Sequence, residues 1–248
     1  MKIIDLNADL GEGMPHEQEI LPLISSANIC CGAHAGSPEI TRATVESCLQ
    51  LGIRIGAHPG YPDPEYFGRQ SFMTLKIKPG PLFNQMVKQT NLIPEAKYIK
   101  PHGAFYNDTA SRAYRYDHLG AKKYKKIKED YSPKPDDIYN VLHASLIITK
   151  LPLMGLANTY HSQIARNAHV LFIPEGFIDR RYDNNHRLLP RSNPDAIIHE
   201  PQEAIDQALR LAKTCDSLCV HGDNPNAPEL LTKVRQALEN DGYTIAPK

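Results

Sequence analysis

Short apolar runs alternate along this chain with stretches of helical periodicity, and this alternation restricts the fold more than any other feature. Each run is about five or six residues long and ends at glycine, proline or a polar cluster, as strands do. Alternating strand and helix patterns are typical of βαβ units, which place parallel strands in one sheet. We predict strands near Ile3–Asn7, Ala27–Cys31, Ile53–His58, Lys97–His102, Leu153–Ala157, His169–Pro174 and Ser217–His221.

The helices between these strands carry end signals. Ser37, Pro38 and Glu39 supply an N-cap, a first-turn proline and an early acid, and Gly52 ends the helix that they begin. A helix near the C-terminus is indicated by apolar residues at helical spacing and by a closing glycine: Leu230, Leu231, Val234, Leu238 and Gly242.

Polar side chains stand where the predicted strands end. Every strand except the fifth is followed by ionisable or imidazole groups: Asp9 and Glu12, His34, His58, His102, Glu175, and His221 with Asp223. An open doubly wound sheet gathers functional groups at one switch point, whereas a closed barrel receives them from all its strands at one rim. We therefore predict an α/β fold, a seven-stranded parallel (β/α) barrel, as a single domain over residues 1–248.

Composition agrees with a soluble globular domain. The chain has 28 basic and 28 acidic side chains and 41% hydrophobic residues, which excludes disorder and argues against a nucleic-acid or membrane-surface protein. Neither a membrane span nor a signal peptide is expected, because no apolar run reaches about 18 residues and acids interrupt the N-terminus. The odd cysteine count, with Cys30 beside Cys31, favours a reducing cytoplasm over a disulfide framework.

One stretch departs from this balance. Residues 108–134 are rich in lysine and arginine with interleaved tyrosines. We interpret them as a basic, solvated excursion from the barrel; the alternative is a surface that binds nucleic acid or a protein partner. The balanced charge of the whole chain favours the solvated excursion, so no nucleic-acid partner is expected.

Three polar residues share one face of the first strand. Asp5, Asn7 and Asp9 stand two residues apart, and Glu12 follows in a glycine-bearing loop. Buried carboxylates are costly unless they find partners. A chain accepts them at a functional site or where an acid anchors backbone amides, and for Asp5 both interpretations stay open.

Two histidines follow matching Gly-Ala sequences. His34 lies in Gly32–Gly36 and His58 in Gly56–Gly60, an echo of one strand–helix step. Neutral imidazoles at successive strand ends could bind a divalent metal, with Asp9 or Asp5 as an oxygen ligand. General acid–base work, substrate binding and a structural role are the alternatives.

Further candidates come from three later segments. Lys100 and His102 share a face, and an inward lysine needs an acid partner, for which Asp5 is one candidate. Arg180 follows Glu175 in a loop, where an arginine fork suits a carboxylate or a phosphate. His221 and Asp223 form a plausible base–orienter pair, and Arg69 and Arg191 are weaker candidates.

Several sequence signatures are missing. The chain contains no Walker A loop, no Gly-x-Gly-x-x-Gly fingerprint and no Gly-x-Ser-x-Gly elbow. Serine-hydrolase chemistry is therefore unsupported, and any nucleotide must bind here in an unusual way or bind to a partner.

Long motifs in a fixed order carry a family resemblance. They are Asp5–Glu12, Ser26–Gly36, Gly56–Asp63 with Phe67–Arg69, Lys100–Asn107, Glu175–Tyr182, Leu189–Arg191 and Cys219–Pro225. Together they resemble the LamB/YcsF family, the A subunit of bacterial 5-oxoprolinase, from Asp5 to the C-terminus. The resemblance implies a barrel of the glycoside hydrolase/deacetylase type. It also implies ATP-dependent opening of 5-oxo-L-proline to L-glutamate together with two other subunits, of the B and C type.

The resemblance assigns no individual roles, so ours are hypotheses. The candidate catalytic residues are Asp5, Asp9, His58, His102, His221 and Asp223. The candidate substrate-binding residues are Asn7, Glu12, His34, Lys100, Glu175 and Arg180. The candidate ligands of a divalent metal are Asp9, His34 and His58. ATP is expected at this subunit or at its partners.

This chain departs from the usual family pattern at Ala33, Ser37, Gln70, Gly176 and Ile178. These positions flank the ionisable groups, so the departures bear on substrate and partner docking more than on the fold. Two alternatives to the lactam-opening activity remain: a stand-alone metal-dependent hydrolase or deacetylase of a sugar or amide, and a substrate-binding subunit without catalysis.

Overall fold

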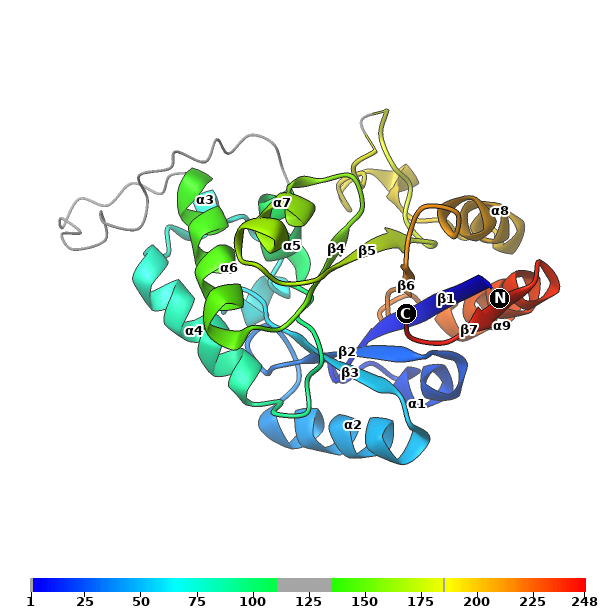
Figure 1. Ribbon diagram of the computed structural model, residues 1–248, viewed down its shortest axis with the longest axis horizontal. Coiled ribbons are helices and arrows are strands. Elements are labelled where there is room, and N and C mark those ends of the chain that lie inside the picture. Colours follow the sequence, from blue (N-terminus) through cyan, green and yellow to red (C-terminus); the bar gives the residue numbers. More distant parts are fainter. Residues whose placement is uncertain (1, 111–134, 185) are drawn as a thin grey trace.

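A curled parallel sheet forms the centre of the molecule (Figure 1). The structure is a computed structural model and describes residues 2–110, 135–184 and 186–248. Its strands are β1 (Lys2–Leu10), β2 (Ser26–Cys30), β3 (Arg54–His58), β4 (Leu153–Leu156), β5 (Phe172–Phe177), β6 (Ser217–Val220) and β7 (Tyr243–Ile245). Six strands run in the order β3-β2-β1-β6-β5-β4, and β7 pairs with the start of β1.

A short extended segment joins the two edges of this sheet. Ile99 forms parallel bridges with Ala57 of β3 and with Leu153 of β4. The Lys100 N–H also donates to the Ala57 carbonyl at 2.9 Å. Segment 97–100 therefore takes the place of the predicted fourth strand, and the predicted parallel (β/α) barrel is confirmed.

Two strands differ from the sequence prediction. β5 begins at Phe172 rather than at His169, because His169 has a φ of 56°, a left-handed conformation that a strand does not continue. β7 was not predicted at all, since Tyr243–Ile245 has only 3 residues and so shows no periodicity.

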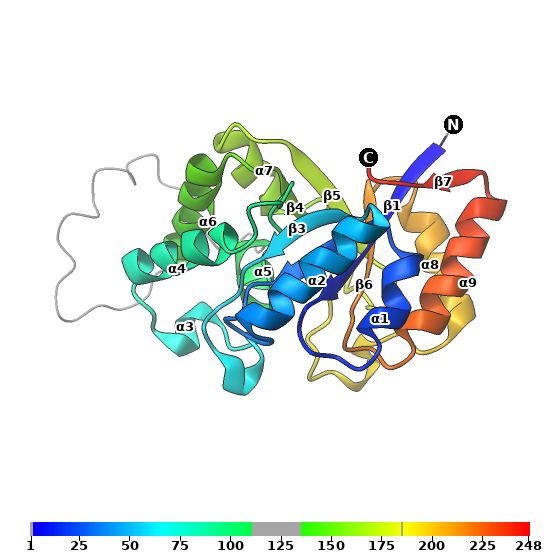
Figure 2. The same ribbon diagram turned by 90° about the horizontal axis from the view of Figure 1, so that it is seen from below.

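Helices cover the outside of the sheet (Figure 2). They are α1 (Glu17–Ile20), α2 (Pro38–Leu51), α3 (Phe72–Leu75), α4 (Pro79–Asn91), α5 (Gly103–Ala110), α6 (Pro135–Thr149), α7 (Tyr160–Asn167), α8 (Pro201–Leu211) and α9 (Ala227–Asn240). Short 3-10 turns lie at Leu21–Leu23, Pro64–Tyr66 and Pro194–Ala196.

The end signals of α2 work as predicted. The Ser37 hydroxyl accepts the Ile40 N–H at 3.2 Å, and Pro38 occupies the first turn. Gly52 closes the helix with a φ of 68°. The predicted C-terminal helix is confirmed as α9, which buries the apolar stripe Leu230, Leu231, Val234 and Leu238.

Alternate residues of β1 face two different environments. Leu6, Ala8 and Leu10 are buried in an apolar core together with Leu231 and Val234 of α9. The residues between them, the predicted polar face, consequently point into the barrel. This alternation aims Asp9, near the carboxyl end of β1, at the mouth of the barrel.

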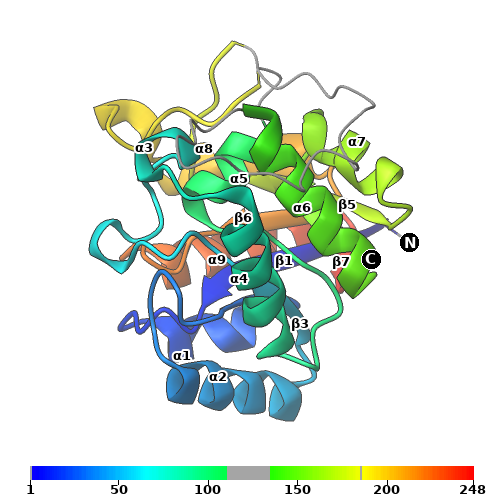
Figure 3. The same cartoon turned by 90° about the vertical axis from the view of Figure 1, so that its left-hand side faces the viewer.

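Most of the predicted basic excursion, from residue 111 to 134, lies outside the described residues. Next to it, α6 packs against α4 and α5 (Figure 3). Among the described helices, none combines the length and the apolar composition that crossing a membrane requires.

Candidate active site

A cavity of about 720 Å³ opens at the carboxyl ends of the strands. Its lining includes most of the predicted ionisable groups and adds aromatic walls and basic side chains: Asp9, His58, Lys100, His102, His221, Tyr106, Phe177, Arg69, Arg180, Arg187 and Arg191. Strand ends that lie far apart in the sequence therefore converge on one mouth, as the barrel predicts.

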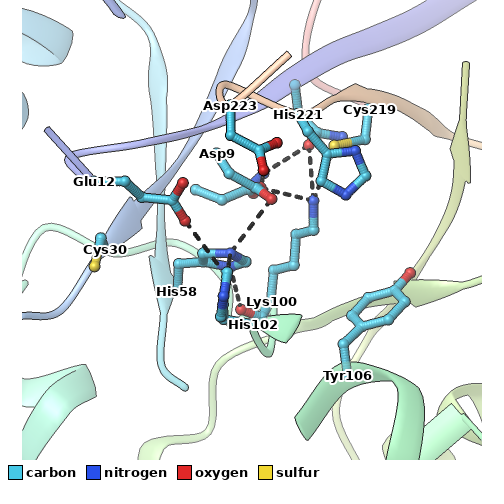
Figure 4. Close-up of polar contacts among 12 residues, drawn as sticks. Asp9, Glu12, Cys30, His58, Lys100, His102, Tyr106, Cys219, His221 and Asp223 are labelled. Atoms are coloured by element: carbon cyan, nitrogen blue, oxygen red, sulfur yellow. Dashed lines mark hydrogen bonds and ion pairs between the residues drawn. The ribbon is translucent and has the colours of Figure 1, made fainter. Parts of the chain in front are cut away.

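Lys100 is the centre of a buried network (Figure 4). Its ammonium lies 2.9 Å from Asp9 Oδ1 and 2.9 Å from Glu175 Oε1, and it donates to Asn7 Oδ1 at 3.3 Å and to the Cys219 sulfur at 3.1 Å. Burial disfavours the ammonium, but the charges of Asp9, Cys219 and Glu175 outweigh it and hold the Lys100 pKa well above its ordinary value.

Asp9 is ionised in this network. Burial opposes its charge, yet His58 and Lys100 outweigh the burial and hold the Asp9 pKa well below its usual range. Asn28 of β2 donates to Asp9 Oδ1 at 2.8 Å and to Asn7 Oδ1 at 2.6 Å, which confirms that the two β1 residues share a face. The carboxylate therefore meets the cavity as an oriented anion.

Asp5 lies away from these groups. Its carboxylate accepts hydrogen bonds from Ser25, Ser26 and Ser217 at 2.5 to 2.7 Å and pairs with Arg54 at 2.8 Å. The suggestion that Asp5 pairs with Lys100 is wrong, because Lys100 pairs with Asp9 and Glu175. Asp5 does not line the cavity, so the geometry favours its anchoring role over its predicted catalytic role.

Three histidines crowd together beside Asp9. The rings of His34 and His102 stack at 3.6 Å between centroids, and His58 meets His102 edge-on at 4.9 Å. Gly60 and Gly68 allow this stack, because a Cβ at either position would come within 2.9 Å or less of a His34 atom. The echoed histidines are not equivalent in position: His58 ends β3, whereas His34 lies beyond the end of β2.

The hydrogen bonds of these rings fix their tautomers. His58 Nδ1 donates to the Lys100 carbonyl at 2.8 Å, and His102 Nε2 donates to the Phe67 carbonyl at 2.9 Å. In the neutral rings the other nitrogens, His58 Nε2 and His102 Nδ1, therefore carry lone pairs, and they face each other at 2.9 Å. A proton or a cation between them is needed to make this contact favourable.

Glu12 completes the cluster. Its Oε1 lies 3.3 Å from His34 Nε2 and 3.4 Å from His102 Nδ1. Burial, reinforced by the charge of Asp9, raises the Glu12 pKa well above its ordinary value. Burial together with the neighbouring histidines lowers the pKa values of His34 and His102 well below theirs. Uncharged imidazoles and a buried acid are donors that a divalent metal can use.

The donor atoms of Glu12, His34, His58 and His102 all lie within 4.8 Å of one another. The predicted metal ligands His34 and His58 belong to this group. Asp9 stands at its edge, with Oδ2 3.4 Å from His58 Nε2. Glu12 and His102 were assigned other roles from the sequence, because spacing could not show that they approach the same point.

His221 is held by an acid that sequence analysis missed. Its Nδ1 lies 3.0 and 3.1 Å from the Asp179 oxygens, and its backbone N–H donates to Asp179 at 3.0 Å. Its Nε2 makes no hydrogen bond to any described residue. The suggested pairing of His221 with Asp223 is wrong: Asp223 binds Arg69 at 2.5 Å and Arg191 at 2.9 Å instead.

Arg180 lies buried in the cavity wall. Its guanidinium donates to the carbonyls of Leu189 and Ala196. It forms no ion pair with a carboxylate in the described ranges. Burial, reinforced by the charge of Arg191, lowers the Arg180 pKa to about 10. The wall therefore contains a cation that an anionic ligand could neutralise.

Sequence analysis also missed two supporting residues. Glu17 accepts four consecutive backbone N–H groups, from Gly11 to Met14, at 2.9 to 3.0 Å, and so fixes the loop that carries Glu12. Tyr106 lines the cavity and donates to Glu175 at 2.8 Å. Glu17 could have been suspected as an acid in the first turn after a glycine-rich loop, but nothing marked Tyr106.

The fold and the site define a parallel (β/α) barrel with a histidine-rich mouth. A solved structure described as the T48 deacetylase with substrate superimposes with a TM-score of 0.52 at 14% identity, over 99% of this chain and 87% of that one. The chain belongs to the LamB/YcsF family, whose model matches residues 4–248.

Individual relatives agree with this membership. The A subunit of 5-oxoprolinase from Neisseria meningitidis is 35% identical, over 99% of this chain and 100% of that protein. The corresponding 5-oxoprolinase subunit of Thermus thermophilus is 34% identical, over 98% of each chain. The crystal structure of the lactam utilization protein from Thermus thermophilus superimposes with a TM-score of 0.80 at 29% identity, over 99% of this chain and 100% of that one.

Proposed function

We propose that this chain is the lactam-hydrolysing subunit of an ATP-dependent 5-oxoprolinase, which opens 5-oxo-L-proline to L-glutamate. The relatives that are named as 5-oxoprolinase subunits support the substrate, since they match over their full length. The observation that carries the proposal is His221, which lies with Arg180 in the cavity wall, is held by Asp179 and has an Nε2 that makes no hydrogen bond to the described residues.

The chemistry asks for three kinds of group. Hydrolysis adds water to the ring carbonyl carbon, breaks the ring C–N bond and leaves a carboxylate and an amine. A base must take a proton from water and pass it to the leaving ring nitrogen, donors must stabilise the oxyanion that forms on the carbonyl, and a cation must bind the substrate carboxylate. We assign His221 as the base, Arg180 as the group that binds the substrate carboxylate, and the His58–His102 pair as the proton or cation site for the carbonyl oxygen.

The remaining predicted residues orient these groups. Asn7 and Glu175 bind Lys100, Lys100 holds Asp9, and Asp9 in turn faces His58. We assign to Asp5 the role of anchoring the amino-terminal part of β1, where its carboxylate accepts hydrogen bonds from three serines and pairs with Arg54.

A divalent metal fits the histidine cluster. The two opposed lone pairs of His58 and His102, the His34 imidazole and the buried acid Glu12 would together supply four donors. When bound there, such an ion would act as a Lewis acid and lower the pKa of a coordinated water. Glu17 would keep Glu12 in position through the loop amides.

The phosphoryl donor belongs to the complex. An unstrained amide is a poor electrophile at neutral pH, so coupling to ATP gives the opening its driving force. Because the chain lacks a Walker A loop, we infer that ATP binds with or at the B-type and C-type subunits. The five free, buried cysteines support a cytoplasmic location.

Reconstitution tests the proposal. We expect 5-oxoproline consumption with ATP hydrolysis only when this chain is combined with both partner subunits. The His221→Asn variant should assemble normally but turn over about 100-fold to 10,000-fold more slowly. Tight 5-oxoproline binding without turnover in the full complex would instead identify a substrate-binding subunit.

The deacetylase-like barrel and the buried Glu/His cluster favour one second candidate, a stand-alone metal-dependent hydrolase or deacetylase. This alternative predicts amide or acetyl hydrolysis by the isolated chain, without ATP or partners, and its loss on chelation. An inactive metal-loaded chain that becomes active only in the complex would exclude it.

A further inference from the structure

The cavity is larger than its proposed substrate and is basic toward solvent. Its volume of about 720 Å³ lies in the range of about 300–1,000 Å³ that accepts drug-sized ligands, whereas 5-oxoproline is one small ring with one carboxylate. On the floor, the His58 and Lys100 side chains are 1% and 2% exposed. Arg69 and Arg191 are 37% and 26% exposed, so these arginines line the outer part.

The two outer arginines converge on one carboxylate. Arg191 binds Asp223 through both terminal nitrogens, at 2.9 Å to Oδ2 and 3.2 Å to Oδ1, and Arg69 reaches Oδ2 at 2.5 Å. Asp223 is only 17% exposed and lines a small cavity that shares Arg180 and Arg191 with the mouth. Two guanidinium groups around one oxyanion are a geometry that phosphate oxygens accept as well as carboxylate oxygens do.

The charges of this region do not balance. Asp223 neutralises one of the two arginines that bind it, and Asp179 is committed to His221. Arg180, buried beside them, forms no ion pair with any carboxylate that the structure describes. The outer mouth therefore has more positive charge than its own acids offset, and an anionic ligand would supply the difference.

Space and an unused donor lie beside Asp223. A small cavity of about 50 Å³ is lined by Arg180, Arg191, Asp223 and Asn224. Asn224 Oδ1 accepts the Asn226 N–H at 3.0 Å, which fixes the orientation of the amide, and the buried Nδ2 has no partner among the described residues. This part of the mouth thus has room for the Asp223 side chain to shift and a donor left without an acceptor.

We propose that Arg69 and Arg191 form an outer subsite for a phosphoryl group, and that phosphate oxygens replace the Asp223 carboxylate there. The inference rests on the proposed function, because the lactam end of the ligand would occupy the floor. A phosphoryl dianion matches the two arginine charges and has enough oxygens for both forks. The phosphoryl group would come either from a phosphorylated small substrate or from a nucleotide.

Calorimetric titration of the full chain at low salt tests the subsite. The probes are methyl phosphate, for a phosphorylated small molecule, Mg-ATP, for a nucleotide, and acetate as a control anion. We expect Arg191→Gln and Arg69→Gln to weaken phosphate binding by about tenfold or more each. Asp223→Asn should strengthen it, because the competing carboxylate loses its charge. The matched control Arg42→Gln removes a surface arginine that pairs with Glu95 and should change nothing.

Whether Asp223→Asn strengthens or weakens phosphate binding decides whether phosphate replaces the Asp223 carboxylate. Weakened binding would mean that Asp223 merely positions the arginines, which overturns the exchange. Phosphate binding that no variant alters would also overturn it. The probe that binds more tightly, methyl phosphate or Mg-ATP, identifies whether the phosphoryl group comes from a phosphorylated small substrate or from a nucleotide. Intact phosphate binding in a chain that fails to support lactam hydrolysis would reject the proposed function but keep the subsite.

Discussion

Asp179 contacts both the ring and the backbone of His221. Its two oxygens lie 3.0 and 3.1 Å from the ring Nδ1, and one of them accepts the backbone N–H of His221 at 3.0 Å. Phe177 stacks on the ring at 5.0 Å between centroids. The imidazole is therefore fixed in orientation before any ligand arrives, and its Nε2 is the nitrogen left for chemistry.

We predict that Asp179→Asn lowers kcat of the reconstituted complex more than it raises KM, because it disturbs the base and not the substrate contacts. Since both residues act through one imidazole, the double variant with His221→Asn should be little worse than His221→Asn alone. Steady-state kinetics of the four proteins measure this. Additive losses would show that Asp179 acts independently of His221.

The same acid makes stability depend on pH. Burial opposes the charge of Asp179, but His221 and its hydrogen bonds outweigh this and lower the Asp179 pKa to about 2. A pKa below the unfolded value, about 3.9, means that the ionised carboxylate stabilises the fold above about pH 4 and loses this effect as the pH falls through about 2. We expect roughly 2–3 kcal/mol of the free energy of unfolding to disappear in that window.

Urea unfolding of the wild-type chain and of Asp179→Asn between pH 2 and pH 5 measures this loss. The difference in free energy of unfolding between them should shrink toward the acid end. Asp206→Asn, which changes an exposed acid that accepts a hydrogen bond from Gln202, is the control and should follow the wild type. Parallel curves for wild type and Asp179→Asn would contradict the prediction.

Lys100→Met should destabilise the chain by about 3–5 kcal/mol. The substitution leaves Asp9 and Glu175 as neighbouring buried acids without their common cation. The control Lys233→Met breaks an exposed pair with Glu229 and should cost less than about 1 kcal/mol. Equal denaturant midpoints for the two variants would show that Lys100 is not essential to the network.

Gly68→Ala and Gly52→Ala separate backbone strain from contact with the histidines. Their φ values are 64° and 68°, so both alanines cost about 1 kcal/mol or slightly more in conformation. At Gly68 the new Cβ would also lie 2.9 Å from His34 and 3.0 Å from His102, whereas at Gly52 it meets nothing within 4 Å. We expect only Gly68→Ala to weaken Co²⁺ binding, followed by its absorption spectrum; equal binding would exclude the stack as part of the metal site.

The barrel could be read from the sequence because its signal is repeated. Every predicted strand except the fifth is followed by an ionisable or imidazole group, and the β1 alternation and the α2 and α9 end signals depend only on local spacing. Segment 97–100 was identified, but its pairing is limited because Pro101 has no N–H to continue the ladder. β7 was not predicted because a strand of 3 residues is too short to show an alternating pattern.

The sequence predicted most of the residues that form the site, but it did not predict which of them bind each other. Lys100 was expected to need an acid, yet only the barrel shows that this acid is Asp9 with Glu175. Asp179 was passed over for Asp223, since proximity in sequence favoured the wrong orienter. Which groups share a partner depends on where strands that are distant in the sequence come together, and spacing along one chain does not encode this.

The closure of the barrel at Ile99 has a consequence for how the site is assembled. Segment 97–100 makes the junction between β3 and β4, and Lys100 within it and His102 just beyond it supply the ammonium that binds Asp9 and the ring that faces His58. Loss of this junction would remove the Lys100 ammonium and the His102 ring from the mouth together. Ring closure and construction of the mouth therefore depend on the same short segment of the chain.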